Sequence, residues 1–155
     1  MNSDHSEIQD SVRVRGHIEV IEQDAATDVV LSHYRGPNIV TDAGETLIAE
    51  RLRGNTAVTG ISLYALGTDA TPPVVGQTAL ITEAYRATLI QSRVSAGDLV
   101  MTIQLGATQG NGFTYQEGGA FNTENTMLCR AIFPAKIKTI TKKLTIIHTV
   151  TFTAA

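Results

Sequence analysis

The sequence predicts a mainly β fold: an antiparallel β-sandwich or small barrel of about seven or eight strands, with one packed α-helix at about residues 42–53. Three observations lead to this prediction. Apolar and polar residues alternate with a period of two in several short segments. Clusters of Gly, Pro, Asn and Asp separate these segments. Only one stretch of the sequence carries the start and stop signals of a helix.

Composition limits the classes of protein to which the chain can belong. Of its 155 residues, 43% are hydrophobic and only 17% are charged, whereas charged residues make up about 25% of an average globular domain. A surface that is poor in Lys and Glu is less protected against association with other proteins. We therefore expect a single β-rich domain over residues 12–155, with a surface that partner proteins partly cover.

Residues 1–11 precede the first predicted strand and are polar and acidic, with Asp4, Glu7 and Asp10. This composition is typical of a flexible arm, which is either a plain disordered end or a segment that orders on a neighbouring subunit. The segment has no apolar core of the kind found in secretory signal peptides. No part of the sequence approaches the roughly 18 apolar residues of a membrane span. We expect a protein that is made in a cytoplasm and does not contact a membrane.

The first predicted strand covers residues 12–21, where apolar and polar side chains alternate. A second, shorter strand is predicted at 29–34. The Gly36-Pro37-Asn38 sequence follows and is expected to end it.

Residues 42–53 carry the clearest helix signals. Asp42 is predicted to be the N-cap, and Glu45, three residues later, completes a pair that resembles a capping box. Gly54 follows as the C′ residue. The apolar side chains expected on one face are those of Leu47, Ile48 and Leu52.

The middle of the sequence is predicted to contain three strands. The first covers residues 61–66, and Pro72 and Pro73 exclude a central strand from the loop that follows. The other two, at 84–94 and 99–105, are expected to form an antiparallel pair through the turn Ser95-Ala96-Gly97-Asp98.

The last part of the sequence begins with a glycine-rich stretch, residues 107–121, which predicts a long loop or a bulged strand. A strand at 127–133 is expected to end at Pro134. The strand at 144–153 alternates most regularly of all. Its apolar side is expected to consist of Leu144, Ile146, His148, Val150 and Phe152, opposite a side rich in threonine.

The sequence lacks the common patterns of catalytic and metal-binding sites. The four histidines do not have metal-ligand spacing, and no nucleophile elbow, phosphate loop or dinucleotide motif occurs. Cys129 lies in an apolar run and is interpreted as a buried, unreactive thiol. His148 is interpreted as a hydrogen-bonded structural histidine. We therefore expect a protein that is not an enzyme and uses no cofactor and no metal.

Two carboxylates, Glu83 and Glu117, stand among nearly apolar strands. A buried carboxylate without a partner is costly. Each is therefore expected to accept backbone N–H bonds or to pair with an arginine such as Arg86 or Arg130. This reasoning predicts structural roles for these residues rather than acid–base catalysis.

Four lysines, Lys136, Lys138, Lys142 and Lys143, form a basic cluster. They are interpreted either as a solvated edge that protects a strand from wrong pairing, or as an electrostatic contact with another subunit, such as its acidic arm. The cluster lacks interleaved aromatic residues and the chain carries a net charge of −3, so direct binding of nucleic acid is not expected.

Six segments occur in an order that resembles one known family. They read NIVTDAGETLIAERLRG, ISLYALGTDATPP, TALITEAYRATL, GFTYQEGGAFN, MLCRAIFPAKIKT and LTIIHTVTFT. Within them, Arg86 follows Glu83, and Gly112-Phe113 precedes a stretch with Glu117, Gly118 and Phe121. From about residue 38 to 153, this pattern resembles the N-terminal domain of phage tail-collar fibre proteins and of related short virion proteins.

The resemblance implies assembly rather than chemistry. It implies a virion protein, made in the host cytoplasm, that binds copies of itself, commonly as a trimer, and neighbouring virion proteins. The tail, baseplate or neck is its expected place. A capsid decoration (cement) protein that clamps neighbouring capsid subunits is the alternative, and a carbohydrate-binding adsorption module is disfavoured by the lack of Trp. The residues expected to make assembly contacts are Asp4, Glu7, Asp10, Lys136, Lys138, Lys142 and Lys143, and those expected to hold the fold are Glu83, Arg86, Glu117, Gly118, Phe121 and Arg130.

Overall fold

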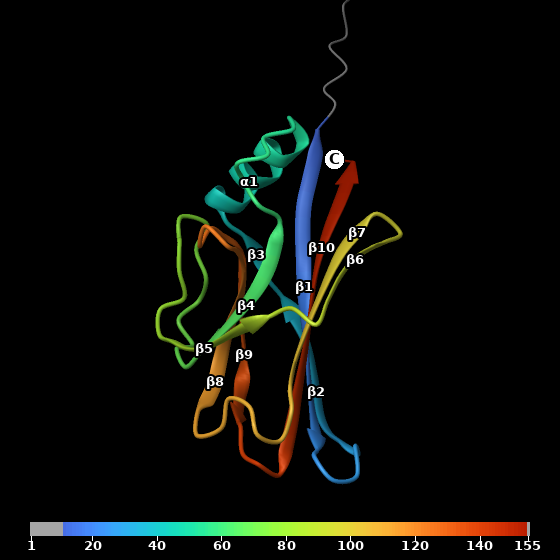
Figure 1. Ribbon diagram of the computed structural model, residues 1–155, viewed down its shortest axis with the longest axis vertical. Helices are drawn as coiled ribbons and strands as arrows, with labels where there is room; N and C mark the ends of the chain where they lie inside the picture. The colour runs from blue at the N-terminus through green and yellow to red at the C-terminus, as the bar shows by residue number, and fades with distance from the viewer. Residues whose placement is uncertain (1–10, 155) are drawn as a thin grey trace, which may run out of the picture.

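Two five-stranded antiparallel sheets face each other in the computed structural model, which describes residues 11–154 (Figure 1). The predicted mainly β class is confirmed, and so is the sandwich-like arrangement, because the sheets do not close into a barrel. The predicted number of strands is too low, since residues 11–154 form ten.

The first sheet, here called sheet A, contains both the first and the last strand of the described chain. Its order is β2-β1-β10-β7-β6. The bounds are Val12–Asp24 for β1, Val30–Pro37 for β2, Gln91–Ser95 for β6, Asp98–Leu105 for β7 and Lys142–Ala154 for β10. β1 and β10 pair along their whole lengths, from Val12 opposite Ala154 to Asp24 opposite Lys142.

The second sheet, sheet B, has the order β3-β9-β8-β4-β5. The bounds are Ile39–Val40 for β3, Ile61–Gly67 for β4, Glu83–Thr88 for β5, Thr114–Asn122 for β8 and Met127–Ile137 for β9. β8 and β9 are the most deeply buried strands, because the segment at 68–82 covers the side of sheet B that faces away from sheet A.

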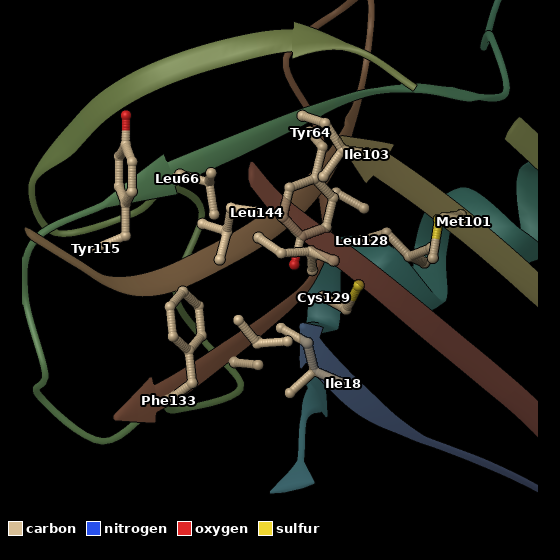
Figure 2. Packing of buried hydrophobic residues seen from close by; sticks show 14 of the residues in the cluster. Ile18, Tyr64, Leu66, Met101, Ile103, Tyr115, Leu128, Cys129, Phe133 and Leu144 are labelled. Atoms are coloured by element: carbon tan, nitrogen blue, oxygen red, sulfur yellow. The ribbon is translucent and has the colours of Figure 1, made fainter. Parts of the chain in front are cut away.

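The core lies between the two sheets, where alternating apolar side chains meet (Figure 2). Burying an aliphatic or aromatic side chain of this size contributes about 1.5–3 kcal/mol. Sheet A supplies Ile18, Val20, Met101, Ile103, Leu105, Leu144, Ile146 and Val150, and sheet B supplies Tyr64, Leu66, Tyr115, Ala120, Leu128, Cys129, Ala131 and Phe133. The alternation predicted for residues 144–153 is therefore present, and Cys129 is buried as predicted.

The single helix of the described chain, α1 (Asp42–Leu52), lies close to its predicted position, but its N-cap differs. Thr41, not Asp42, caps the helix, because the Thr41 hydroxyl accepts a hydrogen bond from the Gly44 N–H at 2.9 Å. The same hydroxyl donates to the Met127 carbonyl at 2.6 Å, which ties the start of α1 to β9. Gly54 follows the helix with a positive φ of 84°, as expected of a C′ glycine.

The strand predicted at 84–94 is in fact two strands in different sheets. β5 pairs with β4 in sheet B, whereas β6 pairs with β7 in sheet A. The chain crosses between the sheets at Leu89 and Ile90, whose N–H groups donate to Ser62 in one sheet and Thr102 in the other. Neither residue is a glycine or proline, so no local signal in the sequence marks this crossing.

The prediction that Pro134 ends its strand is wrong. β9 continues to Ile137, and Pro134 lies where the register shifts between Glu117 opposite Ile132 and Tyr115 opposite Lys136. A proline is tolerated at such a bulge because its missing N–H interrupts no regular ladder bond. β8 has a second shift between Ala120 and Phe121, which agrees with the bulged strand offered as one alternative for residues 107–121.

The helix in residues 11–154 is too short and too polar to cross a membrane.

Candidate assembly surfaces

An ion pair between β8 and β9 lies on the outer side of sheet B. Nε of Arg130 donates to Oε2 of Glu117 at 2.9 Å, and both side chains are fully buried. The Glu117 carboxylate also accepts the N–H groups of Ile81 and Thr82, at 3.1 and 2.8 Å. Arg130 donates to the Thr71 carbonyl at 2.9 Å. The pair therefore fastens the 68–82 segment over sheet B.

Apolar contacts support the same covering segment. Leu80, Ala65, Phe121 and Met127 form a small buried cluster between the segment and sheet B. The guanidinium of Arg86 lies 4.2 Å from the centre of the Phe121 ring, a favourable cation–π arrangement.

The remaining residues with predicted structural roles lie on both sides of sheet B. Arg86 pairs with the partly exposed Glu83, with Nε 2.6 Å from Oε1. Gly118 instead faces the core, where a Cβ atom would lie 2.7 Å from the Tyr64 hydroxyl. The structure thus places five of these six residues on the outer side of sheet B, and the sixth, Gly118, on the side that faces the core.

The four lysines gather at one end of the sandwich, but residues of the same chain engage each of them. Lys142 and Lys143 pair with Glu22 and Asp28. Lys136 donates to the Ser32 hydroxyl at 2.8 Å. Lys138 is only 2% exposed and donates to Asn111 at 2.7 Å, and its burial lowers the pKa of the ammonium group. A wholly solvated lysine edge was therefore the wrong interpretation for Lys138. Asp4, Glu7 and Asp10 lie outside the described residues.

The titratable groups of the core are held neutral by burial. Nδ1 of His148 lies 2.9 Å from the Tyr64 hydroxyl, and Nε2 lies 2.5 Å from the Asn38 amide nitrogen. Burial, with a smaller contribution from His17, lowers the pKa of His148 to about 3. Burial likewise raises the pKa of the Cys129 thiol to about 12. Within residues 11–154, no group of three or more His, Cys, Asp or Glu is arranged to hold a metal ion.

An apolar groove opens between α1 and the end of sheet A where β10 finishes, and it was not predicted. Its volume is about 580 Å³. Figure 1 shows α1 across from the β6–β7 hairpin at this end of the molecule. The lining residues are Leu47, Ile48, Arg51, Leu52, Gly60, Ile61, Ser92, Val94, Leu99, Leu128, Val150 and Phe152.

The groove exists because sheet A extends beyond sheet B. Phe152 and Val94 stand on the same side of sheet A as the core residues Val150 and Leu99, yet they are 39% and 77% exposed. Leu52, expected on the buried face of the helix, is 83% exposed at the rim of the groove. Period-two alternation identifies such side chains as inward-facing, but it does not show where the opposite sheet ends.

The same end of sheet A also has unpaired strand edges. β6 is an edge strand, and in β1 the residues 12–15 pair with β10 alone. Unpaired edges present N–H and C=O groups that another chain can bind. The open end of sheet A therefore combines an apolar groove with backbone groups available for pairing.

Comparison with known proteins identifies one family. Residues 36–153, which include α1 and all the residues that line the groove, match the family described as phage tail-collar fibre protein, N-terminal. No curated protein and no solved structure matches the chain. The match covers most of the chain, supports a structural role in the phage tail fibre and implies assembly with other virion proteins. The chain therefore belongs to the phage tail-collar fibre protein family, through that family's N-terminal domain.

Proposed function

We propose that this chain is a non-enzymatic structural subunit of the phage tail, and that the apolar groove at the open end of sheet A binds a second copy of the chain. The observation that carries the proposal is the groove itself. It concentrates exposed apolar side chains, including Val94, Leu52 and Phe152, at one end of the molecule. Exposed apolar patches of this kind mark contact sites on soluble proteins.

The charge distribution around the groove favours a protein partner. Arg51 is the one charged residue among those that line it, and this arginine already donates to the Val58 carbonyl at 2.7 Å. Depletion of charge at the centre of a patch is typical of protein interfaces. The adjoining edge strand β6 adds backbone groups that a neighbouring copy can pair with.

A charge placed in the groove tests the proposal. Val94→Asp puts a carboxylate where the second copy would bury apolar surface, and Val94 is exposed enough for the fold to tolerate the change. We expect the unmodified protein to be oligomeric by light scattering and the variant to associate at least about tenfold more weakly, a loss of about 1.4 kcal/mol.

Ile140→Asp is the matched control, because Ile140 is 65% exposed in the turn between β9 and β10, among residues that do not line the groove. It should leave association unchanged. Equal association of the Val94→Asp variant and the unmodified protein would exclude the groove. Binding of the labelled protein to purified capsids but not to tails would instead favour capsid decoration.

A further inference from the structure

The charge of the chain is unevenly distributed. The sequence has 15 acidic and 12 basic residues, and three of the acids, Asp4, Glu7 and Asp10, fall within residues 1–10, which contain no Lys or Arg. Subtracting these three leaves 12 acids and 12 bases over residues 11–155. The first ten residues therefore carry the whole net charge of −3.

The outer face of sheet A, which points away from sheet B, carries three exposed arginines close to where this acidic segment joins β1. Arg13 and Arg15 alternate with Val14 on β1 and stand opposite Thr153 and Thr151 of β10. Arg93 on β6 lies in the same row as Val100, Thr149 and His17, so it shares their face of the sheet. Across residues 11–154, these three arginines form no ion pair or side-chain hydrogen bond.

The other charges of this face do not neutralise the arginines. Glu19 is engaged by His33, with Nε2 of His33 2.9 Å from Oε2, and it lies 3.8 Å from His17. Arg35 adds further positive charge and lies 3.2 Å from Nε2 of His17. Asp98 stands at the tip of the β6–β7 hairpin, opposite Ser95. The face is basic overall, with threonines between its arginines.

We infer that the arginine face, defined as Arg13, Arg15 and Arg93 with the threonines between them, is the docking surface for the acidic residues 1–10 of the same chain. Adjacent strands lie about 4.8 Å apart, so Arg93, three strands from β1, is about 14 Å away across the sheet. Ten residues reach up to about 33 Å when extended. The segment joins β1 close to Arg13 in sequence and is long enough to cross the whole face.

The individual contacts are weak, so the acidic segment is expected to dock on its own chain rather than on another molecule. An exposed ion pair contributes about 0–1 kcal/mol, too little for three such pairs to hold a free peptide. A short tether raises the effective concentration of the segment to the millimolar range. The docked segment would shield the arginines from acidic competitors and leave the apolar groove, on the opposite side of sheet A, open. The inference does not depend on the groove binding a second copy.

A nitroxide attached at residue 3 tests the inference by paramagnetic broadening of backbone NMR signals. Ser3→Cys labels specifically, because Cys129 is buried and its thiol pKa is raised to about 12. The Val94→Asp background keeps the protein monomeric if the groove mediates association. At an ionic strength of about 0.02 M, we expect broadening of the amides around Arg93, three strands away from β1, and its loss at about 0.5 M, where screening is strong.

Two charge-removing variants test whether electrostatic attraction holds the segment on the arginine face. Replacing Asp4, Glu7 and Asp10 by their amides, or the three arginines by Gln, should remove the broadening, whereas Arg53→Gln at the C-cap of α1 should not. Equal broadening in the amide variant, or none in the unmodified sequence at low salt, would overturn the inference. Broadening that appears only when a labelled molecule is mixed with a second, isotope-enriched one would show docking between chains and overturn it as well.

Discussion

At the scale of single residues, the pair formed by Glu117 and Arg130 shows how a charged side chain can hold a β fold together without serving chemistry. Both groups are sealed from solvent. The Glu117 carboxylate accepts the N–H groups of Ile81 and Thr82, and Nη1 of Arg130 donates to the Thr71 carbonyl, so both bind the backbone of the 68–82 segment. Removing one member of such a pair leaves a buried charge without compensation, which costs about 3–5 kcal/mol.

Arg130→Met should therefore lower the free energy of unfolding by about 3–5 kcal/mol, as measured by urea denaturation. Arg53→Met removes the exposed pair with Glu50 and should cost no more than about 1 kcal/mol. The double variant Glu117→Met/Arg130→Met should be more stable than Arg130→Met alone. Similar losses for Arg130→Met and Arg53→Met would contradict the structural role given to the buried pair.

The burial of His148 predicts how the stability of the protein depends on pH. Its pKa is about 3 in the folded protein and about 6.5 when unfolded, so below pH 6.5 the unfolded state binds a proton that the folded state does not. Stability must then fall as the pH falls from 6.5, by about 1.4 kcal/mol per unit between pH 6 and 5. His148→Gln removes this group, and its stability should lack that part of the slope. The two proteins differ only at residue 148, so the difference between the two curves isolates His148. Parallel curves would show that His148 is protonated in the folded state.

At the scale of secondary-structure elements, the start of α1 depends on one hydroxyl that belongs to two elements. Thr41 caps the helix and also donates to the Met127 carbonyl of β9. Because a capping hydroxyl contributes about 0.5–2 kcal/mol, Thr41→Ala should cost about 1–2 kcal/mol in thermal or urea unfolding. Asp42→Ala, at the position that the sequence favoured as the cap, should change stability by less than about 0.5 kcal/mol. A larger stability loss for Asp42→Ala than for Thr41→Ala would show that Asp42 caps the helix.

The elements that sequence patterns predicted well are those whose signals are local. The alternation in β10, the glycine after α1 and the turn between β6 and β7 all depend on neighbouring residues, and the structure places them as expected. The crossing at Leu89 and Ile90 depends instead on which sheet each half of an extended run joins. The hydrogen bonds that join each half to its sheet go to the carbonyls of Ser62 and Thr102, which are distant in sequence.

The candidate surfaces differ in the same way. The acidic and basic residue types that pair were evident from the sequence, because a carboxylate among apolar strands requires a partner. The apolar groove was not evident, since Val94 and Phe152 have the alternation of core residues and become exposed only because sheet B ends before them. The separation of the paired lysines from the exposed arginines likewise depends on strand order.

At the scale of the whole molecule, the strands nearest the two ends of the described chain lie side by side within sheet A. β1 pairs with β10 over 13 residues, and β10 also separates β1 from β7. Removing residues 142–155 should therefore leave the chain unfolded by circular dichroism, because β1 loses the neighbour that joins it to the rest of its sheet. Removing residues 1–10 should leave the folded spectrum unchanged. A truncated chain that still unfolds cooperatively would show that β10 is dispensable.

The pairing of β1 with β10 has a consequence for synthesis. During synthesis β1 emerges before the other nine strands of residues 11–154, and its partner β10 is the last of them. Contacts so distant in sequence form late and slowly. A chain stalled before β10 would lack Val150 and Phe152, which line the apolar groove. If the groove binds a second copy as proposed, such an unfinished chain could not join an assembly.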